Sequence, residues 1–162
     1  MARFDGKVAV ITGAARGQGR SHAVRLATEG ADVIALDICH DIDTVAYDLA
    51  TPADLAETAR LVTAQGRRVV PAEVDVRDAD ALSRAISDGA GRLGGVDVVL
   101  ANAGIGIMDA GADPRRAFRD QLDVNLVGVW NTYRGSSAPS HCARRTSSEG
   151  SAPSCPVTPR RR

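Results

Sequence analysis

The first 134 residues alternate between short, continuous apolar runs and longer stretches in which apolar positions recur at helical spacing. The apolar runs predict β-strands at residues 7–12, 32–37, 68–74 and 96–101. Runs without alternating polar positions are typical of parallel strands that are buried on both faces. The pattern therefore predicts a parallel sheet covered by the segments that connect its strands.

Helices are predicted after each of these strands. The first spans about 18–29, and the second starts at Thr51 and Pro52, because threonine caps a helix and proline suits its first turn. The third begins at Asp78 and extends to about residue 92. The last, residues 113–134, is apolar around much of its circumference and should need cover on two sides. Its main apolar face consists of Phe118, Leu122, Leu126, Val129 and Tyr133.

This alternation predicts an α/β fold with a doubly wound, Rossmann-like parallel sheet, right-handed crossovers and the strand order 3-2-1-4. We expect the folded unit to occupy residues 1–134 and to be truncated after the helix that follows strand four. The reason is that no fifth apolar strand can be built from Gly135 onward.

Residues 135–162 differ sharply in composition. They hold 7 serines, 4 of the 7 prolines and 5 arginines, and Val157 is their only aliphatic residue larger than alanine. Such a segment buries too little apolar surface to offset its ordering entropy, so a disordered tail is predicted. The abrupt change favours translation in a shifted frame as a hypothesis about the gene, although a deliberately short protein would read the same.

Charge and cysteine usage argue against several classes of function. The first 134 residues carry 15 basic and 19 acidic groups and form no basic stripe, so no nucleic acid is expected as a partner. No apolar run of membrane-spanning length and no leader pattern occur, so no membrane contact and a cytoplasmic location are expected. The cysteines have no disulfide-framework spacing. No metal is expected either, because no closed ligand spacing joins His40, Asp41, Asp43 and Asp48.

The glycines after the first strand carry the clearest functional signal. Gly13, Gly17 and Gly19 stand between that strand and a helix, where backbone can approach a ligand and helix N–H groups can bind phosphate. The second strand ends on Asp37, about 20 residues further on, where a carboxylate can accept both hydroxyls of a ribose. A dinucleotide site is therefore predicted, against the alternative that Asp37 is a solvated turn residue.

With Thr12 before the glycines and the spacing Gly-x-x-x-Gly-x-Gly, the chain resembles the short-chain dehydrogenase/reductase family over residues 4–134. Further matches are Asp75-Val76 after strand three, Asn102-Ala103-Gly104 after strand four, and Asn125. Ala101 departs from the family, which usually has asparagine there. The sequence of residues 13–51 is similar to that of the mycofactocin-coupled, carveol-dehydrogenase-like subgroup.

The resemblance implies NAD as cofactor and a small alcohol or ketone as substrate, with hydride transferred between the two. Family members are homo-oligomers, and this chain lacks part of their interface. The cofactor-binding residues implied by the match are Gly13, Arg16, Gly17, Gln18, Gly19, Asp37, Asp75, Val76, Asn102, Ala103 and Gly104.

The proton-transfer residues of the family have no counterpart in this chain. The family uses a serine and a tyrosine whose pKa is lowered by a lysine four residues later, because a cation favours the phenolate. Here Lys7 is the only lysine, and Thr51 and Ser137 stand four residues after Tyr47 and Tyr133. Asn125 is the one catalytic candidate that matches, and an asparagine that merely bonds helix backbone is the alternative interpretation.

Three interpretations of function follow from these observations. The first is the NAD-binding part of a catalytically incomplete dehydrogenase. The second is a binding-only protein that holds or senses NAD, or a truncated product without function. The third is an enzyme with a different proton donor. In each case the apolar fourth strand would lie bare at the edge of the sheet, and a bare apolar edge favours association with other chains.

We predict no detectable turnover of any alcohol by this chain. The reason is that no tyrosine has a lysine at the spacing that lowers its pKa. NADH formation with a panel of secondary alcohols measures this directly. A rate that persists after contaminating dehydrogenases are removed would contradict the prediction.

Overall fold

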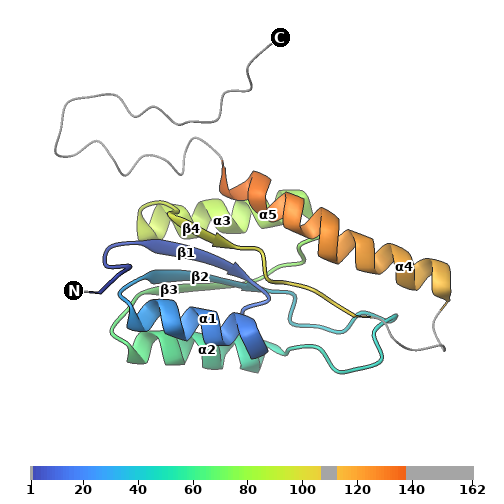
Figure 1. Cartoon of the computed structure of the whole chain (residues 1–162), viewed down its shortest axis with the longest axis horizontal. Helices are drawn as coiled ribbons and strands as arrows, with labels where there is room; N and C mark the ends of the chain where they lie inside the picture. Colours follow the sequence, from blue (N-terminus) through green and yellow to red (C-terminus); the bar gives the residue numbers. More distant parts are fainter. Residues whose placement is uncertain (1, 107–112, 138–162) are drawn as a thin grey trace, which may run out of the picture.

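The computed structural model describes residues 2–106 and 113–137, in which a four-stranded parallel sheet lies between two layers of helices (Figure 1). The strands are β1 (Val8–Thr12), β2 (Asp32–Asp37), β3 (Val69–Glu73) and β4 (Val98–Leu100), in the order β3-β2-β1-β4. Val10 pairs with Ile34 on one side and with Val99 on the other. The predicted fold class and strand order are confirmed.

The helices near the start of the chain cover one face of the sheet, and α3 (Ala79–Leu93) and α5 (Gly128–Ser136) lie on the other (Figure 1). Helices α1 (Gly17–Thr28) and α2 (Pro52–Ala64) pack on Ile11, Val33 and Ala35, whereas α3 packs on Val8, Val10, Ile34 and Leu36. Successive residues of a strand point to opposite faces, which explains why every residue of β1 and β2 is buried. The continuous apolar runs thus encode two cores, one for each layer.

The predicted helix starts are also found. Thr51 accepts a hydrogen bond from the backbone N–H of Asp54, whose carboxylate accepts one from the N–H of Thr51, so α2 begins with a complete capping box. Asp78 caps α3 through the N–H of Ala81, and Gly94 ends that helix in the left-handed conformation at φ 96°.

The last predicted helix is not one continuous α-helix, because a π-helical turn interrupts it. It consists of α4 (Pro114–Leu122), a π-helical turn η1 (Asp123–Val127) and α5 (Gly128–Ser136). Helix α5 continues to Ser136, beyond the end predicted for the last helix at residue 134. The division of the chain at residue 134 into a folded unit and a tail stays a prediction. The rest of the predicted disordered tail, residues 138–162, lies outside the described residues.

The face that α5 buries is made of small and polar residues. A Cβ on Gly128 would lie 2.5 Å from Val76 Cγ2, and one on Gly135 would lie 3.1 Å from Ile86 Cδ1. Asn131 and Thr132 are buried between them. The predicted large apolar face therefore points outward, because only small side chains allow this helix to approach the sheet and α3 so closely. Its exposed members are Phe118, Leu122, Leu126, Val129 and Tyr133, with Trp130 beside them.

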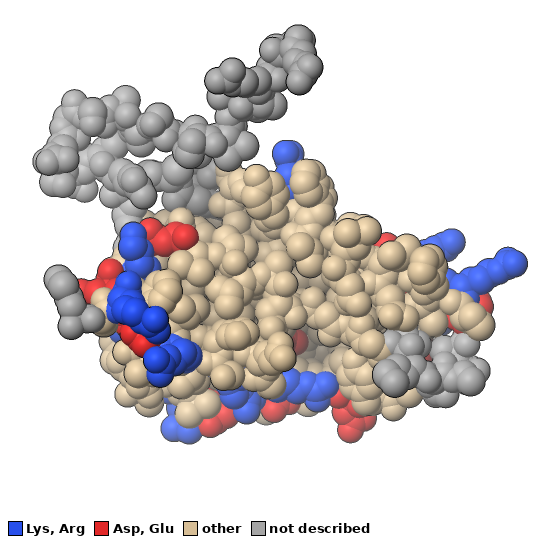
Figure 2. Space-filling model, viewed as in Figure 1, with Lys and Arg blue, Asp and Glu red and all other residues tan. Residues whose placement is uncertain are grey.

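Strand β4 forms one edge of the described sheet, as the sequence predicts. Its paired part is shorter than the predicted strand, and Val99 is 41% exposed. The opposite edge strand, β3, carries Pro71, which lacks an N–H and so resists pairing, whereas β4 has no such residue. Figure 2 shows that charged side chains gather mainly at the margins of this view, around a largely uncharged centre.

A buried carboxylate ties β2 to the segment before β3. Asp32 is 3% exposed and accepts hydrogen bonds from the backbone N–H and the guanidinium of Arg68, while Arg67 Nη2 lies 2.9 Å from its Oδ1. Burial acts to raise the pKa of Asp32. The hydrogen bonds from Arg68 and the charges of both arginines outweigh this effect, so the pKa lies below its usual range.

We predict that Asp32→Asn lowers the free energy of unfolding by about 2 kcal/mol at pH 7, the scale of hydrogen bonds to a charged group. Because the folded-state pKa is depressed, the ionised carboxylate stabilises the fold above the unfolded pKa of about 3.9, and this contribution is lost as the pH falls through the folded pKa. Urea unfolding at pH 7 and pH 3 measures the change.

The matched control is Asp88→Asn. Asp88 is exposed, and its 3.7 Å contact with Arg92 is a surface ion pair of the kind that contributes little to stability. It should leave stability within 0.5 kcal/mol of the parent, roughly the scale of surface substitutions. An Asp32→Asn effect that is the same at both pH values would show that the carboxylate charge is not the stabilising feature.

Candidate functional site

A cavity of about 300 Å³ lies at the carboxyl ends of the strands, where the loops after β1, β2, β3 and β4 meet. Eleven of its lining residues are those that the sequence assigns to a cofactor: Gly13, Arg16, Gly17, Gln18, Gly19, Asp37, Asp75, Val76, Asn102, Ala103 and Gly104. The fold thus brings together residues that are up to 91 positions apart in the chain. Parallel strands explain this, because their carboxyl ends share one edge of the sheet.

Two glycines in the turn from β1 into α1 are packed so closely that a side chain would not fit at either position. Gly13 has φ +65°, and a Cβ there would lie 2.9 Å from Ala103 Cα. A Cβ on Gly19 would lie 1.9 Å from Gly13 O. The glycine spacing is therefore needed to bring the start of α1 against the end of β1, and it leaves backbone on the wall of the cavity.

The wall formed by β1 and β4 is closed by hydrogen bonds between their ends. Thr12 Oγ1 accepts from the N–H groups of Asn102 and Ala103, both at 3.1 Å. Asn102 Nδ2 donates to Thr12 O at 3.0 Å and to Gly13 O at 3.2 Å. Asn102 therefore fixes the glycine turn to the loop after β4.

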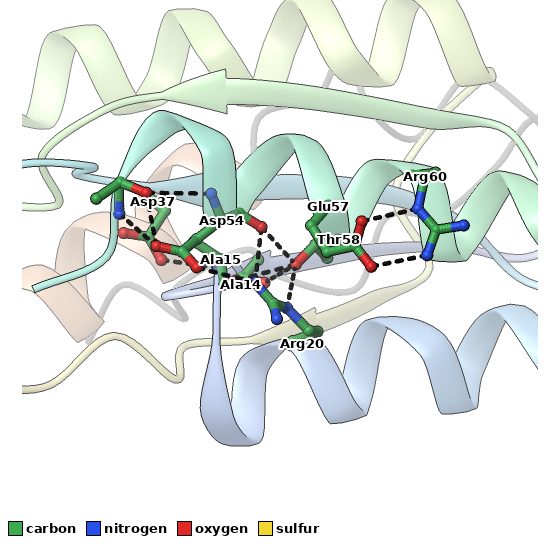
Figure 3. A network of polar contacts seen from close by, with 9 residues as sticks. Ala14, Ala15, Arg20, Asp37, Asp54, Glu57, Thr58 and Arg60 are labelled. Carbon is green, nitrogen blue, oxygen red and sulfur yellow. Dashed lines mark hydrogen bonds and ion pairs between the residues drawn. The ribbon is translucent and has the colours of Figure 1, made fainter.

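Asp37 is held by backbone donors at the end of β2. Its Oδ2 accepts from the N–H of Ala15 at 2.9 Å (Figure 3). Its Oδ1 accepts from the N–H of Cys39 at 3.2 Å. The residue is 7% exposed, yet it lines the cavity. This excludes the alternative that Asp37 is a solvated turn residue, since its carboxylate joins β2 to the glycine turn.

Behind the glycine turn lies a polar network that the local sequence pattern does not reveal (Figure 3). The fully buried Thr58 of α2 accepts from Arg20 Nε at 3.0 Å, and its hydroxyl lies 3.0 Å from Ala14 O. Arg20 Nη2 donates to the carbonyl oxygens of Ala15 and Asp54. These contacts fix two carbonyls of the turn from the side opposite the cavity.

Asn125 lies in η1 and bonds the loop after β4. Its Oδ1 accepts from the N–H of Ile105 at 2.9 Å, and its Nδ2 donates to Ile105 O at 2.8 Å. The alternative predicted from sequence was a bond to helix backbone, and the partner is loop backbone instead. A catalytic role for Asn125 stays a prediction, while its anchoring of the cavity wall is directly visible.

The loop between β2 and α2 contributes lining residues that sequence reasoning did not assign. Tyr47 accepts a hydrogen bond from the N–H of Gly106 at 3.1 Å, which joins this loop to the loop after β4. The apolar character of the segment was the only available signal. The unassigned lining residues are Ile38, Ile42, Tyr47, Leu49, Ala50, Val74, Ile105 and Val124.

Cys39 and Lys7 carry chemically reactive side chains, but neither belongs to a recognisable catalytic centre. Burial, assisted by the charges of Asp37, Glu73 and Asp54, raises the pKa of the Cys39 thiol to about 12, so it is protonated at neutral pH. Lys7 pairs with Asp97 at 3.1 Å, where β1 begins, at the end of the sheet away from the cavity. Lys7 therefore lies away from Tyr47, which lines the cavity.

Two absences apply to residues 2–106 and 113–137. No cluster of His, Cys, Asp or Glu side chains suited to a metal ion occurs there. Nor does any helix in that part of the chain have the length and apolarity to span a bilayer.

Residues 7–139 match the short chain dehydrogenase family. The chain belongs to this family. A (-)-trans-carveol dehydrogenase of Rhodococcus erythropolis is 46% identical over 136 residues, which are 83% of this chain and 49% of that protein. The chain thus spans about half the length of the curated relatives it matches.

Solved structures of the same family superpose on the fold. Carveol dehydrogenase from Mycobacterium avium in complex with NAD is 52% identical with a TM-score of 0.80, over 84% of this chain and 50% of that one. A short chain dehydrogenase from Mycobacterium paratuberculosis bound to NAD is 50% identical with a TM-score of 0.79, over 83% and 51%. The similarity to carveol dehydrogenases agrees with the subgroup that residues 13–51 resemble.

We predict that Gly19→Ala destabilises this short-chain dehydrogenase chain by about 3 kcal/mol, the upper range for overpacking, because its Cβ would overlap Gly13 O. The control is Gly91→Ala in α3, where an added Cβ meets nothing within 4 Å. That change should be neutral or stabilising by about 1 kcal/mol from helix propensity. Urea unfolding compares the variants, and equal stability of Gly19→Ala and parent would show that the turn relaxes freely.

Proposed function

We propose that this chain is the NAD(H)-binding part of an oxidoreductase that transfers hydride between NAD(H) and an alcohol or ketone. The observation that carries the proposal is the cavity between the glycine turn and Asp37, at the carboxyl ends of the strands. Two relatives of 50% and 52% identity are NAD complexes, which supports the same cofactor here.

The start of α1 suits the pyrophosphate of a dinucleotide. Its first turn contains no acidic residue, and Arg16 at the N-cap makes no side-chain capping bond. The N–H groups there are therefore available to an anion, and the helix dipole favours negative charge at this end. We assign this role to Gly13, Arg16, Gly17, Gln18 and Gly19.

The remaining assignments follow the other strands around the cavity. Asp37 presents a carboxylate that can accept from both hydroxyls of the adenosine ribose. Asp75 and Val76 follow β3 and are assigned to the base. Asn102, Ala103 and Gly104 follow β4 and are assigned to the nicotinamide half.

The chemistry available within this chain is incomplete. NAD(H) supplies or accepts the hydride, and a separate group must move the proton of the alcohol. Asn125 is the only catalytic residue we propose, acting on the cavity wall through Ile105. No lysine reaches the cavity, since Lys7 lies at the other end of the sheet.

Because Lys7 is remote from the cavity, no lysine assists proton transfer there. This favours a second candidate function, a protein that binds NAD without turning over substrate. Saturable NAD binding without turnover supports this candidate over a non-functional product. Turnover of a secondary alcohol supports an enzyme with a different proton donor. We further propose membership in the mycofactocin-coupled subgroup, a cytoplasmic location and self-association, as the family resemblance implies.

Calorimetric titration of the full chain with NAD⁺ and NADH tests the proposal. We expect one saturable site per chain and weaker binding in Gly19→Ala. No heat of binding for either form in a folded sample would refute it.

We predict that NAD is bound more tightly than NADP. A 2′-phosphate would stand beside Asp37, and two unit charges about 4 Å apart at an effective dielectric of about 20 repel by about 4 kcal/mol before relaxation and salt. Arg16 is the residue that can reverse this preference by pairing with the phosphate. Calorimetry with both cofactors gives the ratio of dissociation constants.

Asp37→Asn should reduce this ratio by about tenfold or more, because the repulsion is removed. The control Asp48→Asn removes the same charge from an exposed position in the neighbouring loop. It should leave the ratio unchanged. NADP bound by the parent as tightly as NAD would contradict the assignment of Asp37.

A further inference from the structure

Asp75 lines the cavity, and among the described residues its carboxylate is held by one neighbour, Arg77. Asp75 Oδ1 accepts from the backbone N–H of Arg77 at 2.9 Å. Its Oδ2 accepts from Arg77 Nε at 2.8 Å and lies 2.6 Å from Nη2. Arg77 therefore contacts both oxygens of the carboxylate, from its backbone and from its side chain.

Arg77 also links this carboxylate to α4 and to the loop between β2 and α2. Its Nη1 lies 3.5 Å from Asp120 Oδ1 in α4. The other oxygen of Asp120 accepts a hydrogen bond from Thr44 Oγ1 at 2.6 Å. The side chains of Arg77 and Asp120 are 29% and 16% exposed, and Thr44 is buried, so solvent weakens these contacts less than surface pairs.

The two oxygens of Asp75 differ in the acceptor capacity that they retain. Each carboxylate oxygen offers about two lone-pair sites. Both sites of Oδ2 are used by the guanidinium, whereas contacts with the described residues use only one site of Oδ1. A ligand in the cavity can therefore donate one hydrogen bond to Oδ1, whose direction Arg77 fixes.

The charges around the guanidinium keep it in place. Hydrogen bonding to Asp75 raises the pKa of Arg77 against the effect of burial, and the charges of Asp75, Asp120 and Asp123 raise it further. Arginine suits this position because its planar fork contacts a carboxylate through two N–H groups at once.

We propose that Arg77 is a positioning residue that aims Asp75 at the exocyclic amino group of the dinucleotide's purine base. The inference rests on the proposed function and extends it to base specificity. An ionised carboxylate only accepts hydrogen bonds, so it favours a 6-amino purine, which donates, and disfavours a 6-oxo purine, which presents an acceptor. Asp120 supports the arrangement by holding the far side of the guanidinium.

The test compares NAD⁺ with nicotinamide hypoxanthine dinucleotide, which has a 6-oxo group, by calorimetric titration of the full chain. The parent should bind NAD⁺ at least tenfold more tightly than the analogue. Arg77→Met keeps the length of the side chain but removes its donors, and should reduce this preference about tenfold, mainly through weaker NAD⁺ binding. Arg60→Met is the matched control, since Arg60 is exposed on α2 and, within the part of the chain that the structure describes, its side chain pairs only with Glu57.

Arg77→Lys covers the case in which Arg77→Met does not fold. Lysine keeps the charge but cannot make the paired contacts to Oδ2, so the same loss of preference is expected. Equal loss of affinity for both dinucleotides in the Arg77 variants would overturn the proposal, because that is the result of a purely structural role. A parent that binds NAD⁺ without preference over the analogue would overturn it while leaving the proposed function intact. A folded parent that binds neither dinucleotide would overturn both.

Discussion

The carbonyl oxygen of Gly13 is the point on which the site depends. Residue 19 must be glycine because a Cβ there would lie 1.9 Å from this oxygen, and Asn102 donates to the same oxygen from the loop after β4. The end of β1, the start of α1 and the end of β4 therefore meet at one atom. On the other side of the turn, Thr58 and Arg20 hold the next two carbonyls. The backbone that faces the cavity is thus fixed from three directions.

The remaining walls depend on side chains that cross between loops. The loop after β2 is joined to α4 by the pairs Asp43–Arg116 and Thr44–Asp120, and to the loop after β4 by Tyr47. The floor of the cavity is set by sheet packing, whereas its rim is set by these polar contacts. The rim is accordingly the part of the site most sensitive to salt.

The sequence predicts the strands and their order well because burial on both faces demands continuous apolar runs, as in β2, whose bounds match. It also places the glycines and Asp37, since backbone geometry restricts which residues can occupy those positions. The network of Arg20 and Thr58 could not be predicted, because it joins residues 38 positions apart with no local pattern. The orientation of the last helix could not be predicted either. Helical spacing identifies a stripe of large apolar residues on this helix. The helix instead buries a second stripe, made of Gly128, Thr132 and Gly135, because these small residues let it approach Val76 and α3 more closely.

The small-residue face of α5 also restricts how this helix can move. Rolling the helix about its own axis by one position would turn a side chain such as Val129 toward the space beside Val76 that now accepts only a hydrogen atom. Steric exclusion therefore prevents α5 from rotating about its own axis. The large side chains on its outer surface have no part in this restriction. Any displacement of the helix has to be a translation along its axis or a lift away from the sheet, and a lift would pull Asn131 from the Val76 carbonyl to which it donates. Because Val76 follows the cavity residue Asp75 directly, a lift of α5 would be transmitted to the floor of the site.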